Sequence, residues 1–187
     1  MDKIIIIIDA MSIDAFIETD DRTPAFHCKY YHDPERWSEA SPEIKSAINA
    51  LPWSDYIKYL NDDGALSAGL GVIPNDAGGL YLFFIQGQTL PSSEMYLAYV
   101  GRALYTDGEN IRKRVRRYLR ESTSIDGRPK IKRLFKHWKK YLYIRFCYTK
   151  DNKLIENGEK TIIRAILPPF NSDLPDKIEY KAPIKAF

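Results

Sequence analysis

The sequence predicts an α+β fold, an α/β sandwich in which a small antiparallel sheet is flanked by helices. Residues 80–85 and 95–100 are rich in aromatic and aliphatic side chains, and the Gly, Pro and Ser residues between them are typical of a hairpin loop. After Gly101 the apolar residues recur every fourth position, which indicates a helix. A further aromatic segment, residues 141–148, supplies the third strand that we expect in this sheet.

The first 78 residues are predicted to be an acidic extension that packs on a core domain of residues 79–187. They hold 6 Lys or Arg and 14 Asp or Glu, a balance of 6 − 14 = −8. The sequence favours a buried isoleucine strand at residues 3–8 and a helix that begins at Pro42. A second short helix at residues 54–60 and a glycine-rich linker at 64–79 follow. We expect the extension to contribute to substrate choice or to self-association.

Three helices are expected in the core domain, over the residues that follow position 110, over 131–140 and over 154–167. Their apolar faces are Ile111, Val115 and Leu119 in the first, Leu134, Phe135 and Trp138 in the second, and Ile162, Ile163 and Ile166 in the third. Stacking of Trp138 on a nucleobase is the alternative to its packing in the core. Pro168 stops the third helix.

Positive charge is concentrated in one part of the chain. Residues 102–145 hold 15 Lys or Arg and 4 Asp or Glu, a balance of 15 − 4 = +11, although the formal net charge of the chain is only +3. This asymmetry favours a polyanion-binding face, and the alternative is an ordinary solvated surface. The candidate phosphate contacts are Arg112, Arg116, Arg117, Arg120, Lys130, Lys132, Arg133, Lys136, Lys139 and Lys140.

Composition bounds the class of protein. The chain contains no apolar run of 18 residues, so we expect no membrane span. Two cysteines, Cys28 and Cys147, favour a reducing, cytoplasmic setting, with a single disulfide between them as the alternative. Cys28 lies close to His27 and His32, but a second Cys or His pair is missing nearby, so we expect no zinc.

Several motifs occur in a characteristic order. Gly79-Leu80-Tyr81 lies at the start of the first aromatic strand, and Tyr99-Val100-Gly101 lies at the end of the second. Five further positions follow, namely Arg114 with Tyr118 one helical turn later, and Glu159 ahead of Pro168 and Asn171. In this order the chain resembles the GIY-YIG nucleases. The resemblance implies a compact domain with a three-stranded antiparallel sheet flanked by helices.

The same resemblance implies a catalytic set. Glu159 would hold a single Mg²⁺, for which Mn²⁺ substitutes, and a structural ion pair between Glu159 and Arg114 is the alternative. Arg114 would clamp phosphate oxygens, while Tyr118 would hydrogen-bond the phosphate or the attacking water. Asn171 matches the asparagine that is the last of the family's motif positions.

Two tyrosines and a neighbouring cation complete this set. One of Tyr81 and Tyr99 would orient or deprotonate the water, and the sequence does not distinguish them. A phenol has an ordinary pKa near ~10, so it needs a cation to act as a base. Arg102 is placed in the sequence to serve as that cation. The family commonly has lysine there, and arginine keeps the charge but cannot itself be a base.

The expected function is therefore that of a metal-dependent DNA endonuclease, in restriction or anti-phage defence. Homing, repair and RNA nucleases of the same family are alternatives, and so is a non-cutting nucleic-acid-binding or regulatory protein. We expect double-stranded DNA as partner. We also expect a homo-oligomer, because one such active site cuts one strand at a time.

Overall fold

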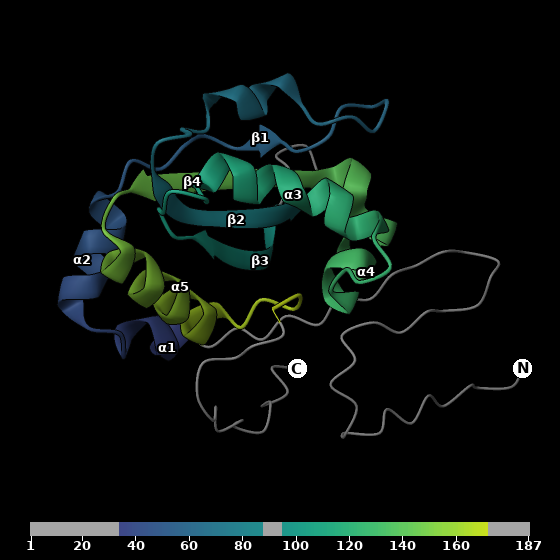
Figure 1. The fold of residues 1–187 in the computed structure, drawn as a ribbon. Helices are drawn as coiled ribbons and strands as arrows, with labels where there is room; N and C mark the ends of the chain where they lie inside the picture. Colours follow the sequence, from purple (N-terminus) through teal and green to yellow (C-terminus); the bar gives the residue numbers. More distant parts are fainter. Residues whose placement is uncertain (1–33, 88–94, 172–187) are drawn as a thin grey trace, which may run out of the picture.

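Residues 34–87 and 95–171 are described by the structure, which is a computed structural model. Within them, four antiparallel strands pair in the order β1, β4, β2, β3 (Figure 1). The strands are β1 (Ile57–Lys58), β2 (Gly78–Gln86), β3 (Met95–Ala103) and β4 (Leu142–Thr149). The helices are α1 (Pro34–Ser38), α2 (Pro42–Ala50), α3 (Ile111–Thr123), α4 (Pro129–Trp138) and α5 (Asn152–Ile166), with the 3₁₀ helices η1 (Ala68–Val72) and η2 (Lys139–Tyr141). The predicted α+β class is confirmed.

The sheet has four strands rather than the predicted three. The added strand β1 pairs with the outer edge of β4, with Ile57 opposite Ile144. It lies in residues 54–60, for which a short helix was predicted, and that prediction is wrong. The backbone N–H of Ser54 donates to Phe146 at 2.7 Å and that of Tyr59 to Leu142 at 2.9 Å. The open edge of β4 thus binds this segment in an extended form, which outweighs its local helical preference.

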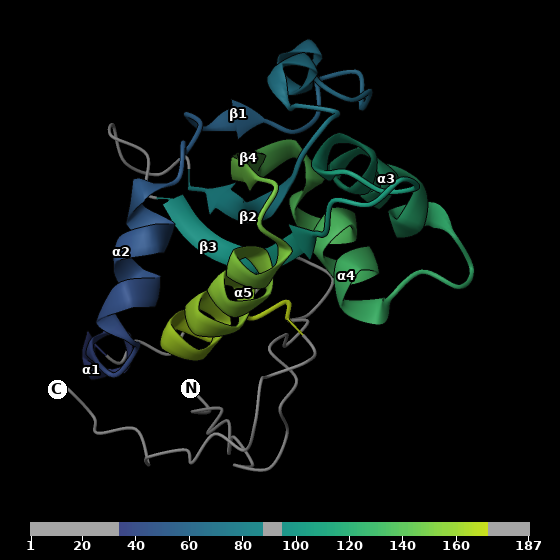
Figure 2. The same ribbon diagram turned by 60° about the vertical axis from the view of Figure 1, so that its left-hand side comes forward.

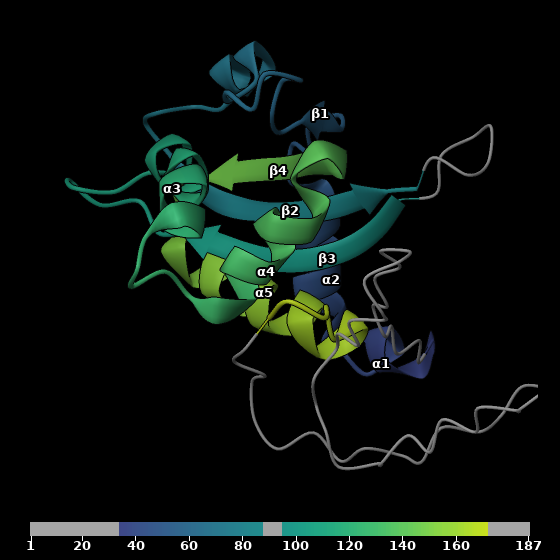
Figure 3. The same cartoon turned by 90° about the vertical axis from the view of Figure 1, so that its right-hand side faces the viewer.

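Each face of the sheet carries its own hydrophobic core, so the molecule has three layers (Figure 2 and Figure 3). Helices α3 and α4 cover one face, and α5 and α2 cover the other. Tyr81 and Phe83 of β2 point toward α3 and α4, whereas Leu80 points toward α5. This alternation follows from the two-residue period of a strand.

Two predicted apolar faces need correction. In α3 the third buried residue is Tyr118, and Leu119 is only partly buried. In α5, Ile166 is 40% exposed because the helix ends there, and Leu167 adopts left-handed backbone angles (φ 50°). Trp138, the last residue of α4, packs against the core, as predicted.

The glycine-rich segment at 64–79 is more than a linker. It contains η1, and Leu70 and Ile73 are fully buried in the core on the α3 side. The proposed boundary between residues 78 and 79 falls inside β2, and α2 packs on α5 through Ile48. Residues 42–78 therefore share both cores with the rest of the described chain.

Several predictions concern residues 1–33, 88–94 and 172–187, which lie outside the described residues. They are the isoleucine strand at 3–8, the group of His27, Cys28 and His32, and most of the hairpin loop. Cys147 is a buried free thiol, and burial raises its pKa to about 12. None of the helices in the described ranges is long and apolar enough to cross a membrane.

Candidate functional site

The pairing of β2 with β3 brings Tyr81 and Tyr99 onto the same face of the sheet. Tyr81 lies opposite Gly101, and Tyr99 lies opposite Phe83. The ring of Tyr81 occupies the space over Gly101, where a Cβ atom would come within 2.5 Å of two ring carbons. The glycine therefore lets the Tyr81 hydroxyl reach across β3.

Tyr118 of α3 joins the two strand tyrosines in one hydrogen-bonded cluster. Its hydroxyl lies 2.7 Å from that of Tyr81 and donates to that of Tyr99 at 3.0 Å. The hydroxyl of Tyr81 also lies 3.3 Å from the carbonyl oxygen of Arg102. All three rings are buried. The structure thus brings together the three tyrosines that the sequence analysis selected from separate segments.

Arg114 lies beside this cluster, as its spacing from Tyr118 predicts. Its Nε donates to the Tyr81 hydroxyl at 3.4 Å, and its guanidinium carbon lies 5.5 Å from the centre of the Tyr118 ring. Both residues are on one face of α3, four positions apart. A fixed cation and three phenol groups therefore converge on one face of this helix.

A second arginine, Arg128, meets the cluster and was missed by the sequence analysis. Its Nη1 donates to the Tyr99 hydroxyl at 3.1 Å, and its guanidinium carbon lies 5.3 Å from the Tyr118 ring centre. Glu121 holds the opposite edge of this guanidinium, at 2.5 Å from Nε and 3.1 Å from Nη2. The sequence contains one signal for it. Arg128 is the N-cap of α4, where the helix dipole disfavours a cation, so a compensating partner elsewhere is needed.

Arg102 and Glu159 form an ion pair, with Nη1 and Oε2 2.6 Å apart. Arg102 lies opposite Leu80, so its side chain projects from the sheet face that α5 covers. Its carbonyl, not its guanidinium, meets Tyr81. The expectation that Arg102 serves as the cation beside a phenol is therefore not met. Glu159 is paired with Arg102 rather than with Arg114, the partner considered from the sequence.

Burial raises the pKa of Tyr81, Tyr99 and Tyr118 above the ordinary value near ~10. The guanidinium groups of Arg114 and Arg128 act in the opposite direction, but the upward shift remains. All three phenols are consequently neutral at physiological pH. They are hydrogen-bonding groups here, and the sequence-based expectation of a cation-lowered phenol pKa is wrong for the protein without substrate.

Asn171 has a clear structural role. Its Oδ1 accepts the Val100 N–H at 2.9 Å, and its Nδ2 donates to the Val100 carbonyl at 2.8 Å. Val100 lies between Tyr99 and Gly101 on β3, the edge strand of the sheet. The amide thus holds the strand that carries these two residues.

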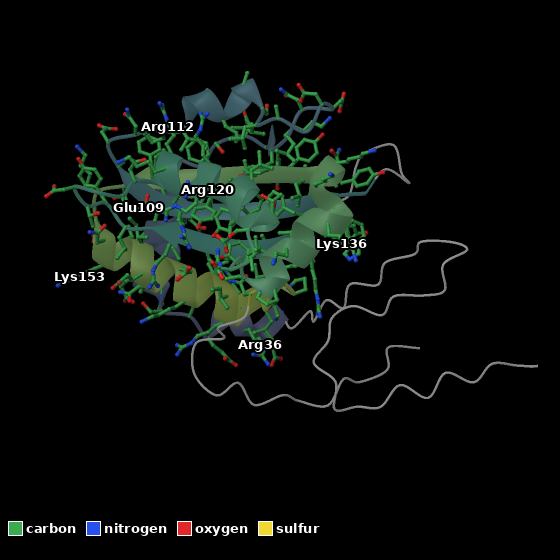
Figure 4. The ribbon with its side chains drawn as sticks, turned by 45° about the vertical axis from the view of Figure 1, so that its right-hand side comes forward. Arg36, Glu109, Arg112, Arg120, Lys136 and Lys153 are labelled. Carbon is green, nitrogen blue, oxygen red and sulfur yellow. The ribbon has the colours of Figure 1, made fainter. Side chains whose placement is uncertain are left out.

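The candidate phosphate contacts divide into two groups. Four have partners that position loops: Arg112 donates to the Ile73 and Gly71 carbonyls, Arg117 pairs with Glu109, Lys130 donates to the Asn171 carbonyl, and Lys132 to the Ile125 carbonyl. The remaining six are exposed on α3, α4 and η2, where Figure 4 marks two of them: Arg116, Arg120, Arg133, Lys136, Lys139 and Lys140.

The donor set for a divalent ion is small. Within residues 34–87 and 95–171, no three His, Cys, Asp or Glu side chains lie together as a metal-binding group. Glu159, at 18% side-chain exposure, is paired with Arg102 on the sheet face that α5 covers, and Mg²⁺ is commonly held by one or two carboxylates with water as its other ligands. The site therefore fits a mostly hydrated ion that competes with Arg102 for this carboxylate.

No family model, curated protein or solved structure matches the chain.

Proposed function

We propose that the chain is a metal-dependent DNA endonuclease of the GIY-YIG type, which hydrolyses phosphodiester bonds in restriction or anti-phage defence. The observation that carries this proposal is the hydrogen-bonded cluster of Tyr81, Tyr99 and Tyr118 with Arg114 beside it. Negative charge protects a phosphodiester, so a hydrolase has to supply a fixed cation and oriented donors where charge develops. Both are present in this cluster.

Each residue of the cluster has a role that follows from its contacts. Arg114 binds non-bridging phosphate oxygens, because a guanidinium is always charged and its geometry matches phosphate. Tyr118 donates to Tyr99, whereas the Tyr81 hydroxyl donates to the Arg102 carbonyl oxygen at 3.3 Å and lies 2.7 Å from the Tyr118 hydroxyl. Tyr99 accepts from Tyr118 and Arg128, and its own proton is then directed to the attacking water or to a phosphate oxygen. The phenols orient these groups while they stay neutral.

Glu159 is the residue that would hold the divalent ion. When bound, such an ion supplies Lewis-acid stabilisation of the leaving oxygen. Arg102 holds the carboxylate in place through a partly exposed ion pair at 2.6 Å.

The exposed basic residues of α3 and α4 support a long polyanion as substrate. Arg116 and Arg120 are exposed on α3 and Lys136 is exposed on α4, so these charges lie at the surface, where successive phosphates of a polyanion would meet them. Such contacts position a duplex and weaken as salt rises. Cutting both strands requires two sites, so we expect two copies of the chain on double-stranded DNA.

Two observations favour a second function, that of a non-cutting nucleic-acid-binding protein. Glu159 is engaged by Arg102, and the phenols have raised pKa values caused by burial. Both features lower reactivity in the protein without substrate. Cleavage assays separate the two functions, because phosphate binding is common to both.

The test is cleavage of supercoiled plasmid and unmodified phage DNA, with Mg²⁺ or with EDTA. The wild type is compared with Glu159→Gln, which removes the charge of the carboxylate but keeps its shape. The control variant is Lys153→Ala, which removes an exposed charge on α5 that projects away from α3 and α4 (Figure 4). We expect Mg²⁺-dependent cutting by the wild type and Lys153→Ala, and a loss of about a hundredfold or more in Glu159→Gln. Salt-sensitive binding with no cutting of any DNA would favour the second function.

A further inference from the structure

Arg128 is held at the tyrosine cluster in a way that leaves part of its guanidinium available. Hydrogen bonds to Glu121 and Tyr99 use three of its five N–H groups. The side chain is 41% exposed, and two of its N–H groups take no part in these three hydrogen bonds. Glu121 binds the Nε and Nη2 edge through both carboxylate oxygens, and this bidentate contact fixes the plane of the guanidinium.

The charges around the cluster do not balance. Arg114 and Arg128 both lie within 5.5 Å of the centre of the Tyr118 ring. Among the described residues, Glu121 is the carboxylate that pairs with either of them, and the phenols are neutral. Within residues 34–87 and 95–171, two cations and one anion thus leave one positive charge in a partly buried place. Such a charge is costly unless an anion compensates it, and Arg128 bears an additional cost because it begins a helix.

We propose that Arg128 is a second phosphate-binding arginine, which binds a non-bridging oxygen of the phosphodiester that Arg114 also binds, with Glu121 as its positioning residue. This inference rests on the proposed function, since it names a further contact of the same site. The phosphate supplies the missing negative charge and takes the two remaining N–H groups. Both guanidinium groups lie beside the Tyr118 ring, and the guanidinium carbon of Arg128 is also 5.8 Å from the centre of the Tyr99 ring.

The first measurement is the salt dependence of DNA binding in EDTA, where metal-dependent cutting does not occur. A short fluorescein-labelled duplex is titrated with the wild type, Arg128→Ala, Arg128→Lys and Lys153→Ala, with fluorescence anisotropy as the readout. Each phosphate contact contributes about 0.9 to the slope of log K against log salt. We expect Arg128→Ala to lower the slope by about 0.9 and to weaken binding roughly tenfold or more. Lys153→Ala, which removes an equal charge from α5, should leave the slope unchanged.

The second measurement separates binding from positioning. Arg128→Lys keeps the charge but loses the planar guanidinium with its paired N–H donors. The slope of log K against log salt should therefore stay near that of the wild type, while kcat for plasmid nicking falls at least tenfold. Glu121→Gln keeps Arg128 charged but no longer fixes its plane. Its kcat should fall about tenfold, while KM stays unchanged or decreases because a repelling carboxylate is gone. A purely structural role of Arg128 would not change the salt slope.

The outcomes distinguish this inference from the proposed function. Wild-type cleavage with an unchanged slope in Arg128→Ala would overturn the phosphate contact and leave the nuclease in place. A slope lowered by about 0.9 in a protein that cuts no DNA would support the contact and reject the nuclease. A wild type that does not bind the duplex would overturn both. Thermal unfolding of Arg128→Ala and of the double variant Arg128→Ala with Glu121→Gln verifies that the binding data come from folded protein.

Discussion

Replacing Asn171 by alanine tests whether this residue holds the edge strand β3. The two side-chain hydrogen bonds to Val100, at 2.9 and 2.8 Å, would both be lost. Asn171 is 7% exposed, so the Val100 N–H and C=O groups would be left buried without these partners. An unsatisfied buried polar group costs about 1–3 kcal/mol. We therefore expect the free energy of unfolding to fall by roughly 2–4 kcal/mol.

Urea unfolding followed by tryptophan fluorescence measures this loss. With a slope of about 2 kcal/mol per molar urea, typical of a small domain, the midpoint should decrease by roughly 1–2 M. The slope itself should not change, because the same surface is exposed on unfolding. A loss below about 0.5 kcal/mol would refute the reasoning, since water would then replace both bonds at little cost.

Asn171→Asp is the matched variant, because it has the same size. A protonated carboxyl can accept from the Val100 N–H and donate to the Val100 carbonyl, whereas a carboxylate cannot donate and is repelled by that carbonyl. Folding therefore raises the pKa of the introduced carboxyl above its ordinary ~3.9. The variant should be closest to wild-type stability below the unfolded-state pKa, and it should lose stability as the pH rises through the folded-state pKa. A deficit that is independent of pH would contradict the two-bond geometry.

Two further predictions concern the tyrosine cluster. Gly101→Ala places a Cβ atom 2.5 Å from the Tyr81 ring, so we expect a stability loss of about 1–3 kcal/mol and a loss of plasmid cleavage. The control is Gly71→Ala, which has no atom within 4 Å of its Cβ position and should change neither. Equal effects of the two substitutions would argue against the steric explanation. Because burial raises the folded-state pKa of Tyr118, its contribution to stability is fully present below the unfolded-state value near ~10 and is lost as the pH rises through the folded-state pKa. Tyr118→Phe should therefore weaken the dependence of urea stability on alkaline pH, and an identical dependence in both proteins would show that this phenol does not ionise on unfolding.

Most of the core elements were predictable from local pattern. Strands β2, β3 and β4 and helices α3, α4 and α5 were located from their periods and turn residues, because apolar spacing and capping are properties of short segments. The strand β1 was not, because its conformation depends on the open edge of β4, some 85 residues further along the chain. The same holds for the buried residues Leu70 and Ile73 in a segment whose composition indicates a loop.

For the candidate site, the sequence by itself determined which side chains are present and in what order, namely three tyrosines, Arg114 and Glu159. Only the tertiary structure decided their partners. It pairs Glu159 with Arg102, uses Asn171 to hold β3, and brings Arg128 to Tyr99. Such contacts depend on strand register and on how helices pack across the sheet. Neither is recorded in the spacing of residues along the chain, because each joins segments that fold from different parts of it.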